Sequence, residues 1–313
     1  MKRKKQSFGV RLGKDIRRYY DVYLLVIPVI LFYFLFCYKP MYGVLIAFKD
    51  FKAVKGILGS PWTSSFGFRH FIDFFDSYYF ARLLKNTLVI SLTSIVIGFP
   101  MPIIFALMLN ELKSTKFKKV VQTISYMPHF ISLVVACGMV RMFVSETGIV
   151  TQFLSLITGH EITRSLLSNS NAFVPIYVLS GVWQELGWGA IIYLSALAGV
   201  DQQLYEAAII DGAGRWKQLV HVTLPGISGA IIIMFLMRIG NVMNVGYEKI
   251  ILLYNEGIYE TADIISSFVY RKGLLNFEWS YSTAVSLFNS VINLVIILVF
   301  NKISKKVTEV GLW

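Results

Sequence analysis

Six long runs of apolar residues constrain the fold of this 313-residue chain more than any other feature. They cover residues 22–38, 87–109, 120–144, 172–198, 227–245 and 284–300. A helix needs about 20 predominantly apolar residues to cross the hydrocarbon core of a bilayer, and each run reaches or approaches this length. Because backbone polar groups must pair within a segment that lies in lipid, we predict six transmembrane helices and an all-α polytopic membrane protein.

The composition excludes an ordinary soluble domain. Apolar residues make up 56% of the chain and charged residues only 15%, whereas soluble domains carry about 25% charged residues. The net charge of +12 raises the question of a nucleic-acid partner, but the basic residues flank the apolar runs, which favours a role in membrane orientation. We therefore expect contact with membrane lipid and no binding of nucleic acid.

The distribution of lysine and arginine predicts the orientation in the membrane. If the basic residues 1–21 lie in the cytoplasm, seventeen basic residues fall on the cytoplasmic side and eleven on the opposite side. Cytoplasmic loops carry the excess of such residues. We therefore predict a basic cytoplasmic N-terminus over 1–21, a six-span domain over 22–300 and a tail over 301–313, with both termini cytoplasmic. No small-residue cleavage site follows the first run, so we expect it to remain as an anchor.

A polar, glycine-containing segment, 201–225, joins the fourth and fifth runs on the predicted cytoplasmic side. Asp201 is placed to cap a short helix that follows it, because its carboxylate can accept from the free amides of the first turn. Gly212 comes where that helix ends with positive φ, which glycine adopts without steric cost. A second helix can begin near Arg215, and Pro225 is expected to set the entry to the fifth span. The segment is thus predicted to be a helix-turn-helix, and simple packing on its own bundle is the alternative.

The same segment carries the strongest motif in the chain. Its residues are Glu206, Ala207, Ala208, Asp211, Gly212, Leu224 and Pro225. The spacing E-A-A-x3-G-x9-[IV]-x-L-P, with Val222 at the branched apolar position, resembles the signature of the permease subunits of bacterial ATP-driven (ABC) importers. The resemblance extends from about residue 19 to the end of the chain and implies the type I ABC importer permease fold.

The resemblance also implies what the segment contacts. In this family it is the coupling helix that docks on the ATP-hydrolysing subunit, so the seven residues above would carry ATPase coupling. The implied partners are a homologous second permease, two ATP-binding subunits, an extracellular solute-binding protein and a carbohydrate, in the cytoplasmic membrane of a bacterium. Residues 86–88 and 238–248 are similar to carbohydrate permeases, and 253–255, 259–263 and 312–313 to polysaccharide or oligosaccharide permeases. We therefore expect import of an oligosaccharide.

Polar and aromatic residues in and just beyond the fourth and fifth runs are candidates for the solute pathway, because polar groups in a membrane tend to face a pathway or one another. The candidates are Trp183, Glu185, Trp188, Asn241, Asn244 and Tyr247. Arg238, Asn241 and Asn244 are spaced three residues apart, so they would share one face of the fifth helix. A structural role, such as pairing of Glu185 with Arg238, is an equal alternative.

The sequence contains no familiar catalytic motif. It has no G-x-x-x-x-G-K-[ST] loop, no H-E-x-x-H motif and no serine elbow, so ATP hydrolysis would belong to partner subunits. The four histidines are scattered, and we expect no metal and no cofactor. The chain is thus predicted to be a transport subunit and not an enzyme. The alternatives are an ABC permease for a peptide or amino acid, an ion-coupled secondary transporter and a membrane-embedded glycosyltransferase.

Overall fold

The computed structural model describes residues 17–313, so most of the predicted basic segment 1–21 lies outside the described residues. Across 17–313 the regular structure is helical, with an isolated β-bridge between Lys49 and Trp62. The chain divides between Arg69 and His70 into two compact units.

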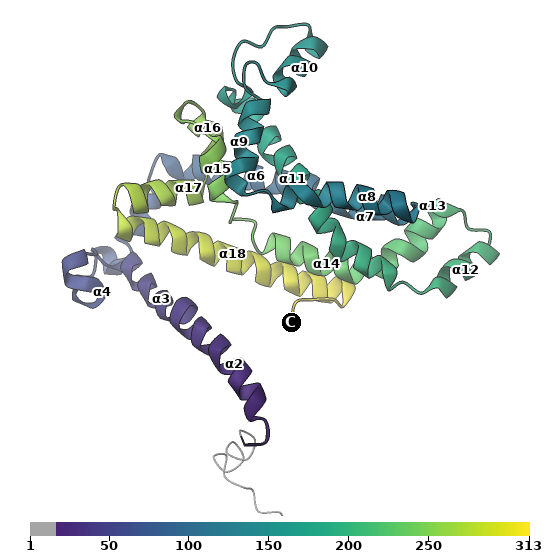
Figure 1. The fold of residues 1–313 in the computed structure, drawn as a ribbon. Helices are drawn as coiled ribbons and strands as arrows, with labels where there is room; N and C mark the ends of the chain where they lie inside the picture. Colours follow the sequence, from purple (N-terminus) through teal and green to yellow (C-terminus); the bar gives the residue numbers. More distant parts are fainter. Residues whose placement is uncertain (1–16) are drawn as a thin grey trace, which may run out of the picture. The chain divides into compact units, whose positions relative to one another are not determined.

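A long apolar helix, Tyr20–Phe48, is the longest element of the described part of the first unit (Figure 1). It is built from α2 (Tyr20–Phe32), η1 (Tyr33–Tyr38), α3 (Lys39–Met41) and η2 (Tyr42–Phe48). The short elements η3 (Ala53–Lys55), α4 (Gly56–Gly59) and η4 (Ser65–Gly67) follow. α2 has no buried residue within the chain. A helix that is apolar on all sides and yet exposed is expected to meet lipid or another subunit.

The second unit contains the other long helices and the segments that join them. The long helices are α6 (Tyr79–Gly98) with α7 (Pro100–Asn110), α8 (Thr115–Tyr126) with η5 (Met127–Phe130), α9 (Leu133–Phe143), α11 (Ser170–Ala198), α14 (Leu224–Ile239) and α18 (Trp279–Thr308). The shorter elements are α5 (Arg69–Phe75), α10 (Ile149–Thr158), η6 (Leu166–Ser168), α12 (Gln202–Ile210), α13 (Arg215–Gln218), η7 (Leu219–Thr223), α15 (Tyr247–Leu253), η8 (Glu256–Ile258), α16 (Tyr259–Ala262), α17 (Ile265–Tyr270) and η9 (Arg271–Leu275).

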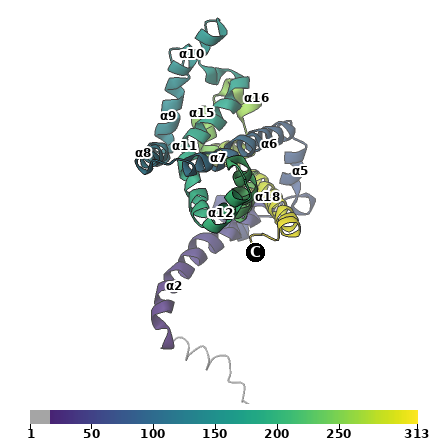
Figure 2. The ribbon, with the colours of Figure 1, turned by 90° about the vertical axis from the view of Figure 1, so that its right-hand side faces the viewer.

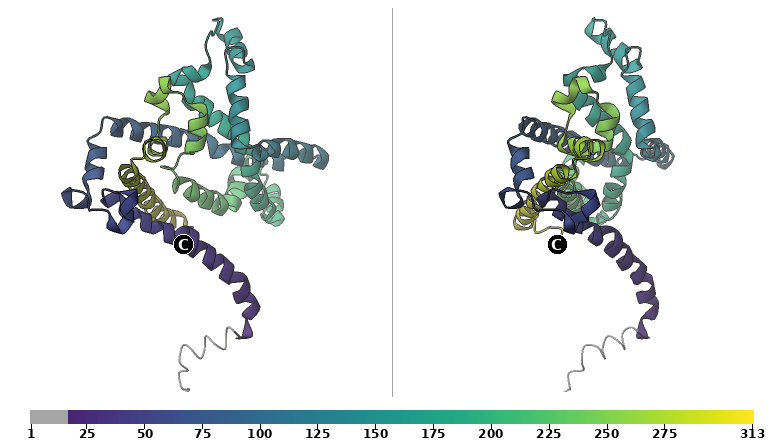
Figure 3. Two further views of the ribbon diagram at one scale, coloured as in Figure 1. Left: turned by 60° about the vertical axis from the view of Figure 1, so that its left-hand side comes forward. Right: turned by 90° about the vertical axis from the view of Figure 1, so that its left-hand side faces the viewer.

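Helix α11 is central to the second unit, and α6, α7, α8 and α14 pack around it (Figures 1 and 3). Ala190 and Tyr193 of α11 share a buried apolar cluster with Ile103 of α7. Gly187 brings α11 against α8, because a Cβ at this position would lie 2.2 Å from the carbonyl oxygen of Ser125. The close approach of these two helices therefore requires glycine.

A sharp break separates α8 and η5 from α9. The two helical stretches are bent by 102° relative to one another. Pro128 lies just before the break, and Ser132 caps α9 by accepting a hydrogen bond from the Val135 amide. The break turns the chain so that the residues next to Pro128 contact α11.

Each of the six predicted runs falls largely on helix. Within residues 17–313, four helical stretches are long and apolar enough to cross a membrane, namely Tyr20–Phe48, Tyr79–Asn110, Arg215–Ile239 and Trp279–Thr308, and the bent pair of α8 and α9 would make a fifth. α11 is not among them, although its 29 residues are long enough. A helix surrounded by other helices can carry polar residues that a lipid-facing helix cannot. That α11, the fourth predicted run, also crosses the membrane therefore stays a prediction.

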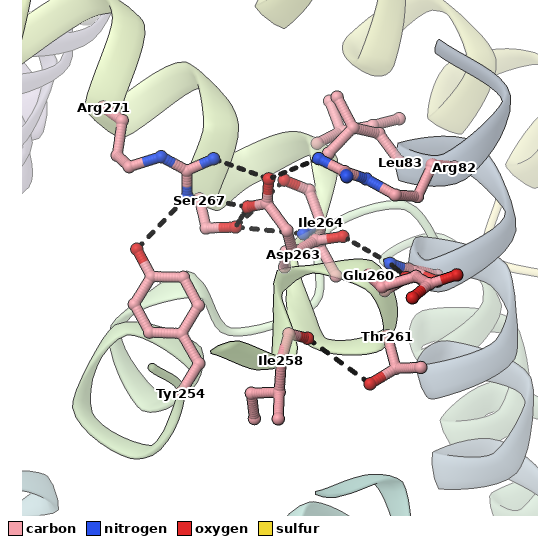
Figure 4. A network of polar contacts seen from close by, with 12 residues as sticks. Arg82, Leu83, Tyr254, Ile258, Glu260, Thr261, Asp263, Ile264, Ser267 and Arg271 are labelled. Carbon is pink, nitrogen blue, oxygen red and sulfur yellow. Dashed lines mark hydrogen bonds and ion pairs between the residues drawn. The ribbon is translucent and has the colours of Figure 1, made fainter. Parts of the chain in front are cut away.

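A buried carboxylate holds the segment between α14 and α18 against α6 (Figure 4). Asp263 is fully buried and accepts hydrogen bonds from Arg271, and a guanidinium nitrogen of Arg82 in α6 lies 3.9 Å from its carboxylate. Burial by itself would lower the pKa of Arg271, but the hydrogen bonds and charge of Asp263 raise it overall. Asn86 of α6 also donates to the carbonyl oxygens of Glu260 and Asp263, at 2.8 and 3.0 Å. This network fixes the segment that contains α15 and α17.

Candidate functional site

The predicted coupling segment forms a capped helix that ends in a tight turn. Asp201 accepts a hydrogen bond from the Gln203 amide at 2.9 Å, which confirms the predicted cap of α12. Gly212 has a φ of 75°, as predicted. The next amide, of Ala213, donates back to the carbonyl oxygen of Ala208 at 2.8 Å. This bond across the glycine belongs to the Schellman type of helix end.

The outward surface of this segment has no partner among residues 17–313. Glu206 and Ala207 are exposed, and Glu206 forms no ion pair with any residue that the structure describes. The apolar side chains of Ile209, Ile210 and Trp216 are 61%, 86% and 74% exposed. Large exposed apolar groups beside a free carboxylate are typical of a surface that docks on another protein.

The other coupling candidates complete this end of the second unit, which faces the viewer in Figure 2. Asp211 is the C-cap residue of α12, and Leu224 and Pro225 begin α14. The hydroxyl groups of Tyr205 and Thr223 lie 3.0 Å apart and join α12 to η7. The seven candidates thus lie on α12, in the turn that follows it and at the start of α14.

The second half of the segment differs from the prediction in one respect. α13, η7 and α14 form one continuous helix, Arg215–Ile239, so the second helix does not end before Pro225. The stretch Leu219–Thr223 is π-helical, and the missing amide of Pro225 falls where the hydrogen-bond register changes to α-helical. α13 is therefore continuous with α14.

A cavity of about 800 Å³ lies among α6, α7, α11, α14 and α15. Five predicted pathway residues line it, namely Glu185, Trp188, Asn241, Asn244 and Tyr247. Trp183 is not among its lining residues. Two residues before Glu185, it points to a different side of α11, because successive helical residues are rotated by about 100°. The structure therefore brings together all the candidates except this tryptophan.

The prediction that Arg238, Asn241 and Asn244 share one face of the fifth helix is wrong. All three residues nevertheless line the cavity. α14 ends at Ile239, and the amides of Asn241 and Asn244 form turns with carbonyl groups three residues earlier. Gly240 lies close to α18, since a Cβ there would be 2.6 Å from a side-chain carbon of Ile297. This packing places the flexible glycine where the helix ends.

Glu185 pairs with His129 and not with Arg238. Nδ1 of His129 lies 3.2 Å from a carboxylate oxygen of Glu185. The His129 ring also stacks on Trp188, with 4.4 Å between the centroids and 2° between the planes. Sequence analysis missed this contact, which joins residues 56 positions apart. The signal in the sequence is Pro128, which directly precedes His129 within the apolar run 120–144 and indicates that the helix is interrupted there.

Lys249 is a further cavity residue that sequence analysis did not single out. Its side chain is largely buried, and its amine donates to the carbonyl oxygen of Tyr177 at 2.9 Å. Burial lowers the pKa of Lys249 to about 8, and Cys137 and Glu185 offset only part of this change. The signal in the sequence is a lysine that directly precedes the apolar residues 250–253.

A second cavity, of about 430 Å³, adjoins the first, because Asn244 and Tyr247 line both. Its lining is rich in hydroxyl, amide and aromatic groups, namely Ser266, Tyr270, Trp279, Ser282, Thr283, Ser286, Asn289 and Ser290. The side-chain oxygen of Asn289 is buried without a hydrogen-bond partner. Such a lining can exchange hydrogen bonds with a hydroxylated solute. Within residues 17–313, no cluster of His, Cys, Asp or Glu could hold a metal ion.

Long apolar helices, a cavity among them with polar and charged residues in its lining and an exposed helical segment at one end define a polytopic membrane transport protein. Residues 98–309 match the family of the binding-protein-dependent transport system inner membrane component, and the chain belongs to this family. It is therefore a multi-pass inner-membrane permease of an ABC importer, a transport subunit and not an enzyme. This membership argues against a secondary transporter and against a glycosyltransferase.

Proteins of known role or structure resemble almost the whole chain. The polygalacturonan/rhamnogalacturonan transport system permease protein YteP of Bacillus subtilis (strain 168) is 40% identical over 99% of this chain and 95% of its own length. A crystal structure of a bacterial ABC transporter involved in import of the acidic polysaccharide alginate contains a chain that is 43% identical, with a TM-score of 0.86, covering 95% of this chain and 99% of that one. A second structure shows the bacterial alginate ABC transporter in complex with an alginate pentasaccharide-bound periplasmic protein. It contains a chain that is 42% identical, with a TM-score of 0.87, covering 96% of this chain and 100% of that one. The type I ABC importer permease fold is thereby confirmed.

Proposed function

We propose that this chain carries an oligosaccharide across the cytoplasmic membrane of a bacterium by alternating access, with energy from ATP hydrolysis on partner subunits. Two adjoining cavities that share Asn244 and Tyr247 support this role, because a chain of sugar units needs a polar surface longer than one site. The names of the similar transporters, for polygalacturonan or rhamnogalacturonan and for alginate, support the same class of solute.

The lining of the first cavity suits sugars. Flat aromatic faces, here Trp188 and Tyr247, can stack on the apolar faces of sugar rings. The amides of Asn241 and Asn244 can donate to hydroxyl groups and accept from them. A concave site with aromatic walls and a few placed polar groups is the usual form of a small-molecule site.

One observation carries the proposed mechanism: a continuous helix joins the docking segment to the cavity. Arg215–Ile239 begins beside the exposed α12 surface, and Arg238, in its last turn, lines the cavity. Closure of the ATP-binding subunits would push on α12 and α13. Because a helix is stiff along its axis, this push would move the cavity wall as a rigid body.

We further propose the assembly and orientation of the transporter. The chain would pair with a homologous second permease, two ATP-binding subunits and an extracellular solute-binding protein, with both termini in the cytoplasm. The exposed apolar surface of α2 and the free surface of α12 support contacts with other subunits or lipid. A relative seen with an oligosaccharide-bound periplasmic protein supports the solute-binding partner.

The test of the proposed function is Asn244→Ala in the assembled transporter. Loss of a hydrogen bond to a buried partner costs about 1 to 3 kcal/mol, so uptake of labelled oligosaccharide should fall about five- to a hundredfold. Uptake, complex assembly and ATP hydrolysis are measured in proteoliposomes. Asn276→Ala is the matched control, since Asn276 is exposed and lines neither cavity.

Loss of uptake with assembly and ATP hydrolysis retained supports a pathway role for Asn244. Its side-chain oxygen also accepts a hydrogen bond from Asn289 at 2.9 Å. Unchanged uptake, or a complex that does not assemble, would therefore assign Asn244 to helix packing and contradict the proposed pathway.

A further inference from the structure

Two cationic side chains face the larger cavity without a carboxylate partner. Arg238 ends α14 and Lys249 lies in α15, and both line the cavity. Within residues 17–313, neither of them has an oxygen of an acidic side chain within ion-pair distance. The buried cation Arg271 is different, because it has the carboxylate of Asp263.

Lys249 is the more unusual of the two, because only 9% of it is exposed. Its ammonium group has three donors, and the hydrogen bond to the carbonyl oxygen of Tyr177 uses one. The other two have no acceptor among the described residues. A buried charge without a counter-charge is costly, and an anion bound in the cavity would offset that cost.

Both cations line the cavity together with Tyr177. The Lys249 amine lies 4.8 Å from the centre of the Tyr177 ring. Gly181 makes room for the amine, since a Cβ there would lie 3.2 Å from it. The absence of a side chain at Gly181 of α11 thus leaves space for the Lys249 amine of α15.

The acidic residues of the cavity do not neutralise these cations. Glu185 is held by His129, and it acts on Lys249 only from beyond ion-pair distance. Glu248, in the first turn of α15, also lines the cavity, but it forms no ion pair with either cation among the described residues. The buried amine of Lys249 beside Tyr177 and the exposed guanidinium of Arg238 thus line the cavity without an ion-paired carboxylate among the described residues.

We propose that Lys249 and Arg238 form a subsite for a carboxylate, so that the oligosaccharide imported by this chain contains sugar acids. This inference rests on the proposed function, because it names the class of sugar that uses the same cavity. A guanidinium binds a carboxylate through two parallel hydrogen bonds, and the ammonium adds a point charge from α15. The neutral second cavity then accommodates hydroxyl groups of neighbouring units.

The test measures uptake of three trisaccharides by the complete transporter with its solute-binding protein: a galacturonate trisaccharide, its carboxyl-reduced neutral counterpart and a sulfated counterpart. Lys249→Met and Arg238→Met should each lower galacturonate uptake about ten- to a hundredfold, the usual effect of losing a hydrogen bond to a charged group. Each ratio of variant to wild type uses the same solute-binding protein, so selection by that protein cancels. Lys302→Met, on an exposed lysine that lines neither cavity, is the control.

Each outcome decides the inference. Arg238→Met removes no hydrogen bond or ion pair described within the chain, so it tests the subsite even if Lys249→Met prevents assembly. Uptake of galacturonate by both variants at the wild-type rate would overturn the subsite. If the wild type took up the neutral or the sulfated trisaccharide but not the galacturonate one, the assignment of the subsite to a carboxylate would be wrong. The proposed function, import of an oligosaccharide, would stay intact. Uptake of none of the three by the wild type would overturn both.

Discussion

Glycine at two positions of this permease serves different physical needs. Gly212 has a left-handed φ of 75°, and nothing lies within 4 Å of the place where its Cβ would be. Gly187 lies inside α11, and a Cβ there would collide with the backbone of Ser125. The first glycine is required by its own backbone conformation, and the second by a neighbouring helix.

Alanine at these two positions should therefore have different effects. Gly187→Ala is expected to lower the stability of the complex by about 1 to 3 kcal/mol or more, because the Ser125 backbone cannot easily move. Gly212→Ala should cost about 1 to 2 kcal/mol, confined to the turn. Gly138→Ala, in helix α9 with open space around it, is the control and should be neutral or slightly stabilising. Thermal unfolding of the purified complex measures all three, and equal effects of Gly187→Ala and Gly138→Ala would contradict this assignment.

At the scale of elements, α12 combines a well-capped backbone with an outward surface that the described part of the chain leaves uncovered. The cap at Asp201 and the turn at Gly212 satisfy backbone groups at the two ends of the helix, and Tyr205 holds its inner side to η7. Glu206 and Ile210 can therefore remain exposed while the helix keeps its shape. A preformed helix is suited to docking, because little conformational entropy is lost on binding.

Charge reversal on α12 should uncouple the transporter. In Glu206→Lys, attraction to a basic group on the ATP-binding subunit becomes repulsion, so uptake should fall at least about tenfold and co-purification of that subunit should weaken. The permease itself should still reach the membrane, because no span changes. Glu161→Lys, on an exposed residue between α10 and η6, is the matched control. Normal uptake by Glu206→Lys would count against the coupling role.

The Asp263 network is the element-scale contact that holds the segment over 240–278 in place. Asp263→Asn leaves Arg271 and Arg82 without their carboxylate, and breaking a buried ion pair costs about 3 to 5 kcal/mol. The melting temperature of the complex should fall, with the loss of protection in hydrogen exchange concentrated in this segment. Glu260→Gln changes an exposed carboxylate close by and should have little effect. Similar melting temperatures for the two variants would show that the network is not stabilising.

At the scale of the whole molecule, the basic residues predict which side of the membrane each segment occupies. In a background without Cys37 and Cys137, single cysteines at Thr115 and Lys217 should resist an impermeant thiol reagent in intact cells. Cysteines at Glu161 and Glu256 should react. All four positions are exposed, so protection cannot arise from burial within the chain. Reaction at position 217 from outside would reverse the proposed orientation.

The sequence alone determined the features that depend on residues close together in the chain, namely the helices, their caps and their turns. Apolar runs predicted the helices, because crossing a bilayer depends on length and hydropathy. The cap at Asp201 and the positive φ of Gly212 were also predictable, since a helix end is fixed by a few consecutive residues. The coupling motif lies in the same local segment, and a family resemblance was enough to find it.

Only the tertiary structure decided how distant residues meet. His129 reached Glu185 because the chain bends by 102° after Pro128, and Lys249 reached Tyr177 across 72 positions. Neither contact leaves a periodic signal in the sequence, because side-chain pairing between helices depends on their crossing and rotation. Gly240, where α14 ends, likewise meets Ile297 of α18, 57 positions later in the sequence. The cavity and its charges arise from this packing, which no single segment specifies.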